Sequence, residues 1–167
     1  MEEKLLPAEE QEAEKNLRFL TKENLNSSSS VKLFAQFDVS FLNNRNTFGK
    51  LEKLKSRKSI DILFKEGKSV ATNGFTLVYL QQPLNTFYPA QASFSVPKKF
   101  FKHAVDRNRI KRMMREAYRL NKILLYKNLA QRKNQLLLMF IYKGKAIPTS
   151  ANTSSAILSC INRLIKE

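Results

Sequence analysis

A basic helix, predicted over residues 106–127, is the feature that most constrains how this chain folds. At about 100° per residue its apolar side chains share one side, between roughly 80° and 200° from Arg112. They are Ile110, Met113, Met114, Ala117, Leu120 and Leu124. The opposite side, next to Arg112, holds Asn108, Lys111, Arg115, Arg119 and Lys122. Such a helix needs a core under one side and an anionic partner on the other.

The cations of this helix repel one another unless something neutralises them. Like charges three or four residues apart cost about 0.2–0.5 kcal/mol per pair in an isolated helix. Only Asp106 and Glu116 are close enough to offset them. The alternative is an ordinary solvated surface, but such surfaces usually mix both signs. The pattern therefore favours a surface that binds phosphate groups.

The whole chain is strongly basic, with a formal net charge of +16 and a pI of about 10.1 over 167 residues. This balance indicates nucleic acid or an anionic membrane as the partner. The apolar run at 135–142 is too short to span a bilayer, and the N-terminus is acidic where a secretory signal is basic. We therefore expect a cytoplasmic protein with one folded domain.

The chain offers little for metal or disulfide chemistry. It has one cysteine, Cys160, and one histidine, His103, which exclude an internal disulfide and a Cys-based zinc site. The acidic residues Asp61, Glu66 and Asp106 form no clustered pair with Glu116 for two-metal hydrolysis. We predict no catalytic and no metal-binding residue on the protein.

Charge divides the chain into two parts. Residues 1–23 contain seven Glu against four Lys or Arg, a net charge of −3, so the rest carries +19. A polar linker follows at 24–30. We predict that residues 1–46 are a mostly disordered extension. Its apolar residues could dock on something, or the segment is a plain tail; they are Leu17, Phe19, Leu20, Phe34, Phe37, Val39, Phe41 and Leu42.

The remaining pattern predicts an α-β-β-α-β-α order. Ser56 or Ser59 caps a short helix that ends at Gly67 in the left-handed conformation. Segments 75–80 and 92–96 are expected to form an antiparallel pair. After the basic helix, the unbroken apolar run 136–142 is typical of a central strand, and 149–166 has helical spacing. The expected product is an α+β two-layer sandwich.

Aromatic side chains add a possible stacking surface. Alternation places Phe75, Leu77 and Tyr79 on one face of their strand and Thr76 on the other. If the Thr76 face packs under the helices, Phe75 and Tyr79 lie on the open face beside Phe64, where they can stack with nucleobases. The other arrangement buries these rings in the core.

Two ordered stretches resemble a known family. The chain has Phe-Ser-Val-Pro-Lys-Lys at 94–99, Ala-Val-Asp-Arg-Asn-Arg-Ile-Lys-Arg at 104–112 and Arg-Glu-Ala-Tyr-Arg at 115–119. This order closely resembles the signature of the protein subunit of bacterial ribonuclease P. The upstream Lys-Leu-Lys-Ser at 53–56, Gly67 and the first strand agree, so the resemblance covers about residues 47–166.

The resemblance implies both a fold and a function. The fold would be the class named after domain 2 of ribosomal protein S5, with a left-handed β-α-β crossover, which local patterns do not predict. The family's RNA subunit removes the 5′ leader of precursor tRNA with Mg²⁺ ions, while the protein binds that RNA, 1:1, and the leader. The protein alone would be inactive and hold no cofactor.

The resemblance also assigns residues to two sites. Contact with the catalytic RNA falls to Arg107, Asn108, Arg109, Lys111, Arg112, Arg115 and Arg119. The leader-binding cleft is assigned Lys55, Phe64, Phe75, Tyr79, Lys98 and Lys99. Four features depart from the family pattern: Pro97, the bulkier loop 100–103, Ile60 in place of the family's Phe, and the acidic extension at 1–46.

Two other classes of protein fit the composition. A structural RNA-binding protein, such as a ribosomal protein of similar fold, has the same charge but no reason to reproduce the Arg-Asn-Arg order after Lys-Lys. A DNA-binding module would need a partner helix before the basic helix, or dimer-forming heptads. Neither is visible in the sequence.

Overall fold

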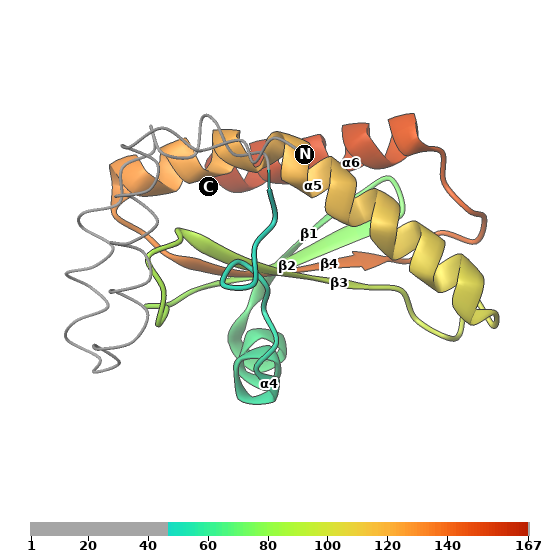
Figure 1. Ribbon diagram of the computed structural model, residues 1–167, viewed down its shortest axis with the longest axis horizontal. Coiled ribbons are helices and arrows are strands. Elements are labelled where there is room, and N and C mark those ends of the chain that lie inside the picture. The colour runs from blue at the N-terminus through green and yellow to red at the C-terminus, as the bar shows by residue number, and fades with distance from the viewer. Residues whose placement is uncertain (1–46, 167) are drawn as a thin grey trace, which may run out of the picture.

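The structure, a computed structural model, describes residues 47–166, and the predicted extension 1–46 lies outside them. One four-stranded sheet has helices on both faces (Figure 1). The elements in chain order are α4 (Arg57–Glu66), β1 (Lys68–Thr72), β2 (Phe75–Gln81), β3 (Ala90–Ser95), α5 (Ala104–Arg132), β4 (Leu136–Tyr142) and α6 (Ser150–Lys166). The α+β sandwich predicted from the sequence is confirmed.

The sheet contains one strand more than the sequence predicted. β1 pairs with β2 in an antiparallel hairpin, and the turn between them uses Asn73 and Gly74, both with positive φ. An Asn-Gly pair between two strands is the usual signal for such a tight turn. β1 was missed because only Val70 and Thr72 of its five residues are buried, which is weak patterning for a strand.

The predicted antiparallel pairing of segments 75–80 and 92–96, which correspond to β2 and β3, is wrong. The order is β1-β2-β4-β3, so β4 separates them, antiparallel to β2 and parallel to β3. β4 is the central strand expected from its apolar run, and α5 connects β3 to it. In Figure 1 β3 lies in front of β4, both run from left to right and α5 passes above them, which makes this crossover left-handed.

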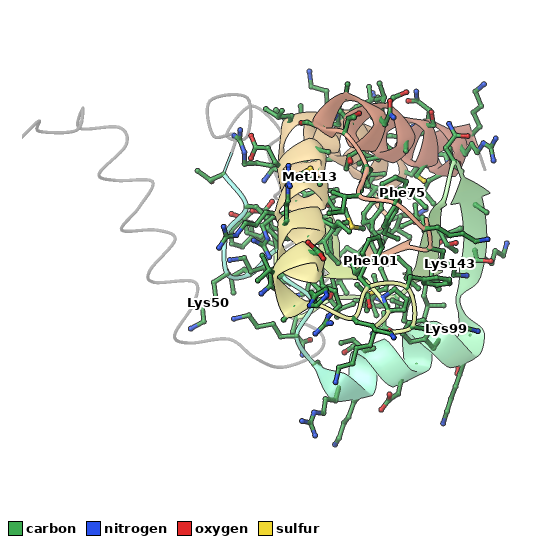
Figure 2. All side chains as sticks on the ribbon, turned by 90° about the vertical axis from the view of Figure 1, so that its right-hand side faces the viewer. Lys50, Phe75, Lys99, Phe101, Met113 and Lys143 are labelled. Atoms are coloured by element: carbon green, nitrogen blue, oxygen red, sulfur yellow. The ribbon has the colours of Figure 1, made fainter. Side chains whose placement is uncertain are left out.

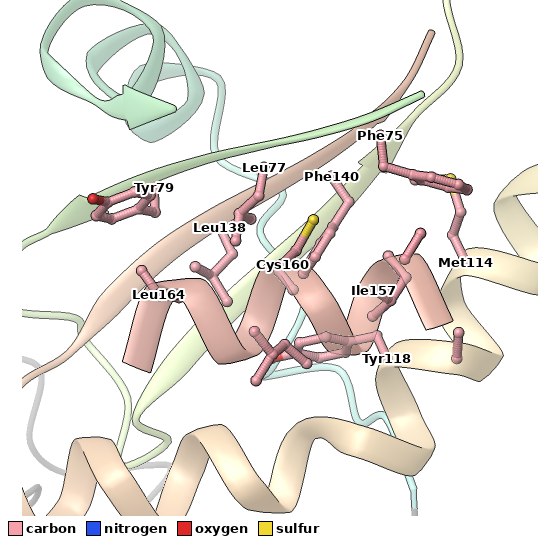
Figure 3. Close-up of a cluster of buried hydrophobic side chains, with 14 of the residues drawn as sticks. Phe75, Leu77, Tyr79, Met114, Tyr118, Leu138, Phe140, Ile157, Cys160 and Leu164 are labelled. Carbon is pink, nitrogen blue, oxygen red and sulfur yellow. The ribbon is translucent and has the colours of Figure 1, made fainter. Parts of the chain in front are cut away.

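The main core lies between the sheet and the layer formed by α5 and α6. Phe75, Leu77 and Tyr79 of β2 point into it, together with Leu138 and Phe140 of β4 (Figure 3). The opposite face of the sheet has a smaller core under α4, where Leu63 packs with Val78, Leu84, Leu137 and Met139. Both faces of β2 are therefore apolar, which is why alternation alone did not decide which one faces the helices.

α4 begins and ends for identifiable reasons. The Ser56 hydroxyl accepts from the Ser59 amide at 3.3 Å, which confirms Ser56 as the N-cap. Gly67 ends the helix as predicted but not in the left-handed conformation, since its φ is −73°. Glycine is needed because a Cβ there would lie 2.2 Å from the Leu63 carbonyl oxygen. The close approach of the chain, rather than an unusual dihedral angle, selects this residue.

Candidate nucleic-acid interface

The N-terminal half of α5 carries an exposed row of polar and cationic side chains. We call Asn108, Arg109, Arg112 and Arg115 the α5 ridge; all four are exposed. Lys111 and Arg119, also predicted to contact RNA, are half-buried at its margins. The helix is held from below by Ile110, Met114, Ala117 and Tyr118, which are buried in the main core. Because these buried residues fix the orientation of α5, the side chains of the α5 ridge face solvent.

Arg119 differs from the ridge residues because it is paired. Its Nε donates to Glu116 Oε2 at 2.9 Å and its second guanidinium nitrogen contacts Oε1 at 2.6 Å. These hydrogen bonds from Arg119 hold the pKa of the Glu116 carboxyl below its usual range. An exposed pair of this kind stabilises the helix little. The main effect of the pair is electrostatic, because the negative charge of Glu116 neutralises the positive charge of Arg119 beside the α5 ridge.

Arg107 makes a contact that the sequence did not suggest. One terminal guanidinium nitrogen donates to the carbonyl oxygens of Phe101 and Lys102, at 2.9 and 2.7 Å. Phe101 is buried with its ring stacked on Tyr142, 6.0 Å between centroids. Arg107 therefore holds the loop between β3 and α5 against the start of the helix, at the end of the molecule seen in Figure 2.

This loop carries two of the predicted leader-binding cations. Lys98 and Lys99 are exposed on it, directly after the strand β3. The Phe100 and Phe101 amides both donate to the Pro97 carbonyl, at 3.2 and 3.4 Å, so the loop begins as a tight turn. The bulky loop is thus ordered by a turn at one end and by Arg107 at the other.

Replacing Arg107 by methionine is expected to release the loop and to lower the free energy of unfolding by about 1–3 kcal/mol, because two hydrogen bonds to a charged group are lost. Chemical denaturation measures the loss, and hydrogen exchange of residues 98–103 should accelerate. The matched control is Arg112→Met on the exposed ridge, which should change stability by less than about 0.5 kcal/mol. Equal effects of the two substitutions would show that the loop contact contributes nothing.

The second candidate surface lies on the sheet face opposite α5 and α6. α4 covers one part of this face. The uncovered part, which we call the open face, presents the half-buried side chains of Thr76, Ser93, Ser95 and Ile141. Lys98 and Lys99 follow β3 at its edge, and α4 adds Phe64, whose side chain is 54% exposed. Lys55 is exposed just before α4.

Phe75 and Tyr79, predicted for the leader cleft, do not lie on the open face. They are only 2% and 9% exposed and point toward α5 and α6 (Figure 3). The Phe75 ring packs on Tyr142 at 4.6 Å. Among the described residues, Phe64 is therefore the one ring of this predicted set that a base can reach. The open face itself presents hydroxyl and aliphatic groups instead.

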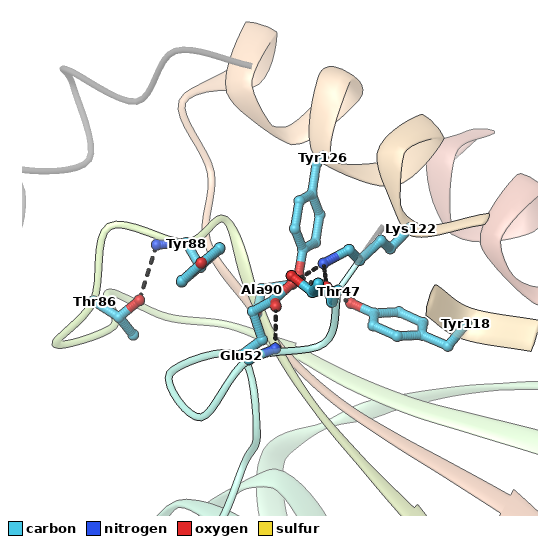
Figure 4. Close-up of polar contacts among 9 residues, drawn as sticks. Thr47, Glu52, Thr86, Tyr88, Ala90, Tyr118, Lys122 and Tyr126 are labelled. Atoms are coloured by element: carbon cyan, nitrogen blue, oxygen red, sulfur yellow. Dashed lines mark hydrogen bonds and ion pairs between the residues drawn. The ribbon is translucent and has the colours of Figure 1, made fainter. Parts of the chain in front are cut away.

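A buried charged cluster, absent from the predictions, anchors the segment before α4. We call residues 47–56 the arm. Lys122, predicted on the cationic side of α5, is 1% exposed and donates to the Glu52 carboxylate and the Thr47 carbonyl (Figure 4). The Tyr126 hydroxyl donates to Glu52 Oε1 at 2.9 Å, and the Gly49 amide donates to Oε2 at 2.6 Å. Burial raises the pKa of Tyr126 well above its ordinary value.

The arm is also paired to the sheet. The Ala92 amide donates to the Glu52 carbonyl at 2.8 Å, and the Leu54 amide donates to the Ala92 carbonyl at 3.0 Å. These bonds cover part of the free edge of β3 and fix the point where the chain turns into α4. The arm therefore sets the position of Lys55 and of the helix that carries Phe64.

A further feature of the described part of the chain is how its metal-ligating side chains are distributed. Within residues 47–166, no three His, Cys, Asp or Glu side chains come together in a way that would hold a metal ion. The same part of the chain has no helix with the length and apolar character needed to cross a membrane.

Comparison with known proteins gives a consistent result. The family model described as Ribonuclease P matches residues 48–166. The ribonuclease P protein component of Porphyromonas gingivalis is 35% identical over 120 residues, covering 71% of this chain and 88% of the relative. That of Chlorobaculum tepidum is 33% identical, covering 72% and 84%.

Solved structures agree in fold. The Staphylococcus aureus RNase P protein superposes with a TM-score of 0.56 at 21% identity, covering 69% of this chain and 96% of that structure. The Thermotoga maritima RNase P protein gives a TM-score of 0.55 at 23% identity, covering 67% and 96%. Because the family model spans almost all described residues and the relatives align over most of their length, the chain belongs to the family of ribonuclease P protein components.

Proposed function

We propose that this protein binds the ribonuclease P RNA through the α5 ridge and the 5′ leader of precursor tRNA on the open face, and so assists leader removal. As a ribonuclease P protein component it is part of an endoribonuclease holoenzyme and a partner of its RNA. The observation that carries the proposal is the exposed row of cations on α5. A surface of this kind binds phosphates without reading base sequence, which suits a rigid RNA partner.

The open face supports the second half of the proposal. Single-stranded nucleic acid binds where cations follow the backbone and a ring stacks on a base. Lys98 and Lys99 stand at the edge of the open face and Phe64 stands on α4. Hydroxyl groups of Thr76, Ser93 and Ser95 can hydrogen-bond sugars or phosphates between them.

Catalysis is assigned to the RNA subunit. We propose that the protein binds its RNA 1:1, holds no cofactor of its own and leaves Mg²⁺ to the RNA–protein holoenzyme. Two-metal hydrolysis needs a pair of metal ions about 3.5–4 Å apart, with ligands around both. The charged side chains of the two surfaces are cations, which repel Mg²⁺ but neutralise phosphates.

Reconstitution tests the function directly. The full chain is combined with a bacterial ribonuclease P RNA and precursor tRNA at low magnesium, and formation of the mature 5′ end is followed. We expect stimulation over RNA alone, and no cleavage by protein without RNA at any magnesium concentration. Lack of stimulation with RNA binding intact would favour a structural RNA-binding protein, whereas cleavage by RNA-free protein would contradict the assignment of catalysis.

Replacing Phe64 by alanine is expected to weaken binding of substrates that have a leader by about 5- to 150-fold, because stacking on one base contributes about 1–3 kcal/mol. Affinity of the reconstituted holoenzyme for precursor tRNA with and without its leader measures this. Leaderless RNA should bind as to the wild type, and Phe64→Tyr should restore most of the loss. Ile62→Ala, an exposed apolar change on the same helix, is the matched control. Equal losses with both RNAs would remove Phe64 from the leader site.

A further inference from the structure

An apolar stripe on α5 lies mostly outside the core. The sequence predicted that Met113, Leu120 and Leu124 face the core. Met113 is half-buried and packs against the main core as predicted, but Leu120 is 52% exposed and Leu124 is 47% exposed. At about 100° per residue, these three side chains lie within roughly 40° of one another along the helix. We call them the α5 stripe. The function proposed above makes no use of it.

The stripe is exposed because the buried side of α5 turns along its length. In the N-terminal half the core contacts come from Ile110, Met114 and Ala117. In the C-terminal half they come from Lys122, Leu125 and Tyr126, which lie further around the helix because the arm packs there. In its C-terminal half, α5 therefore buries the side that faces the arm, and Leu120 and Leu124 remain exposed to solvent.

The arm also determines where the preceding residues start. The Thr47 carbonyl accepts from Lys122 Nζ, so the described part of the chain begins at Thr47 beside α5, and Lys122 lies between Leu120 and Leu124 in the helix sequence. Figure 1 shows the arm rising from α4 to the layer of α5. Around the solvent-exposed side of α5, the half-buried Ile123 lies between the side that contacts the arm and the side that carries Leu120 and Leu124.

We propose that residues 31–42 of this chain pack on the α5 stripe. Eight of these twelve residues are apolar, with one Lys and one Asp: Val31, Leu33, Phe34, Ala35, Phe37, Val39, Phe41 and Leu42. The chain from position 42 to Thr47 makes five residue-to-residue steps, which reach about 17 Å when extended. That matches half the circumference of a helix about 10–12 Å wide. The segment that precedes Thr47 is therefore long enough to reach the α5 stripe and apolar enough to pack on it.

Other occupants fit the stripe less well. RNA is a polyanion and gains nothing from aliphatic side chains. A second copy of the chain would need about 20–30 residues on each side for a stable interface, and the stripe offers three. A segment tethered a few residues away has a local concentration near the millimolar range, so a small contact suffices.

Hydrogen exchange of the full chain tests the proposal. Backbone amides of residues 34–42 should exchange at least about tenfold more slowly than in an unfolded peptide of the same sequence. The double substitution Leu120→Gln and Leu124→Gln, which keeps good helix formers, should abolish this protection, and Phe37→Ser with Phe41→Ser should do the same. Val105→Gln is the matched control, because Val105 is 77% exposed on α5 away from the stripe.

Each other outcome would overturn the proposal. Unprotected amides in the wild type would mean that the segment does not pack, and protection that survives the α5 substitutions would place it elsewhere. Protection that grows with protein concentration would assign the stripe to a second copy. Circular dichroism of the variants verifies that α5 is intact, so a loss of protection reports on the contact itself.

Discussion

Replacing Lys122 by methionine is expected to lower the free energy of unfolding by about 3–5 kcal/mol, the usual cost of removing one partner of a buried ion pair. Methionine fills the space of the lysine stem. Among residues 47–166 it leaves the Glu52 carboxylate, 1% exposed, with Tyr126 and Gly49 as its donors. Urea denaturation at neutral pH, monitored by circular dichroism, measures the loss. This is the largest stability effect we expect from a single substitution.

Two variants separate the ion pair from general disruption. The double substitution Glu52→Gln with Lys122→Met removes both charges and should restore most of the stability, since a buried pair replaced by neutral groups is often close to neutral. Lys127→Met, an exposed lysine on the same helix, should change the free energy by less than about 0.5 kcal/mol. A double variant no more stable than Lys122→Met would contradict the role given to the charge.

Replacing Arg109, Arg112 and Arg115 together by glutamine is expected to give the largest loss in RNA binding. Each lost phosphate contact lowers the slope of log K against log salt by about 0.7–0.9, so the slope should fall by about 2–3. The difference in affinity between wild type and variant should then shrink by about 20- to 40-fold from 50 to 200 mM salt. Filter binding or fluorescence titration of ribonuclease P RNA over that range measures it.

The matched control removes the same net charge elsewhere. Lys127, Lys133 and Lys166 are exposed near the C-terminal ends of α5 and α6, away from the α5 ridge. Their triple replacement by glutamine should leave the salt slope within about one unit of the wild type. If both triple variants lower the slope equally, net charge rather than the ridge determines binding.

The sequence predicted the fold well where a pattern is local and failed where two patterns compete. β4 was recognisable because seven successive apolar residues suit a strand buried on both faces. The position of β4 between β2 and β3 has no local signal. β2 has apolar residues on both faces, so the sequence allowed Phe75 and Tyr79 to lie either on the open face or in the main core. The structure places them in the main core, under α5 and α6.

The candidate site shows the same division. The α5 ridge follows from helical spacing, since Arg109, Arg112 and Arg115 are placed by the same rotation that buries Ile110 and Met114. Lys122 obeys that spacing and is nonetheless buried, because its partner Glu52 lies 70 positions away in the sequence. The sequence likewise predicted Arg107 only as a further RNA-binding cation, and its hydrogen bonds to the preceding loop were not foreseen. Its loop contact depends on where the chain turns before the helix, which composition does not show.

The place of β4 in the sheet has a consequence for how the protein forms during synthesis. The strand that joins the two halves of the sheet is made after β1, β2, β3 and the 29 residues of α5. Until residue 142 is available, β2 and β3 each lack the neighbour that covers their inner edges, and the basic helix has no complete surface to pack on. Pairing across such a long crossover is slow, because the connecting chain must first be ordered. The nascent protein therefore exposes its basic helix and its unpaired strand edges together, and both are covered once β4 pairs with β2 and β3 and the main core closes under α5.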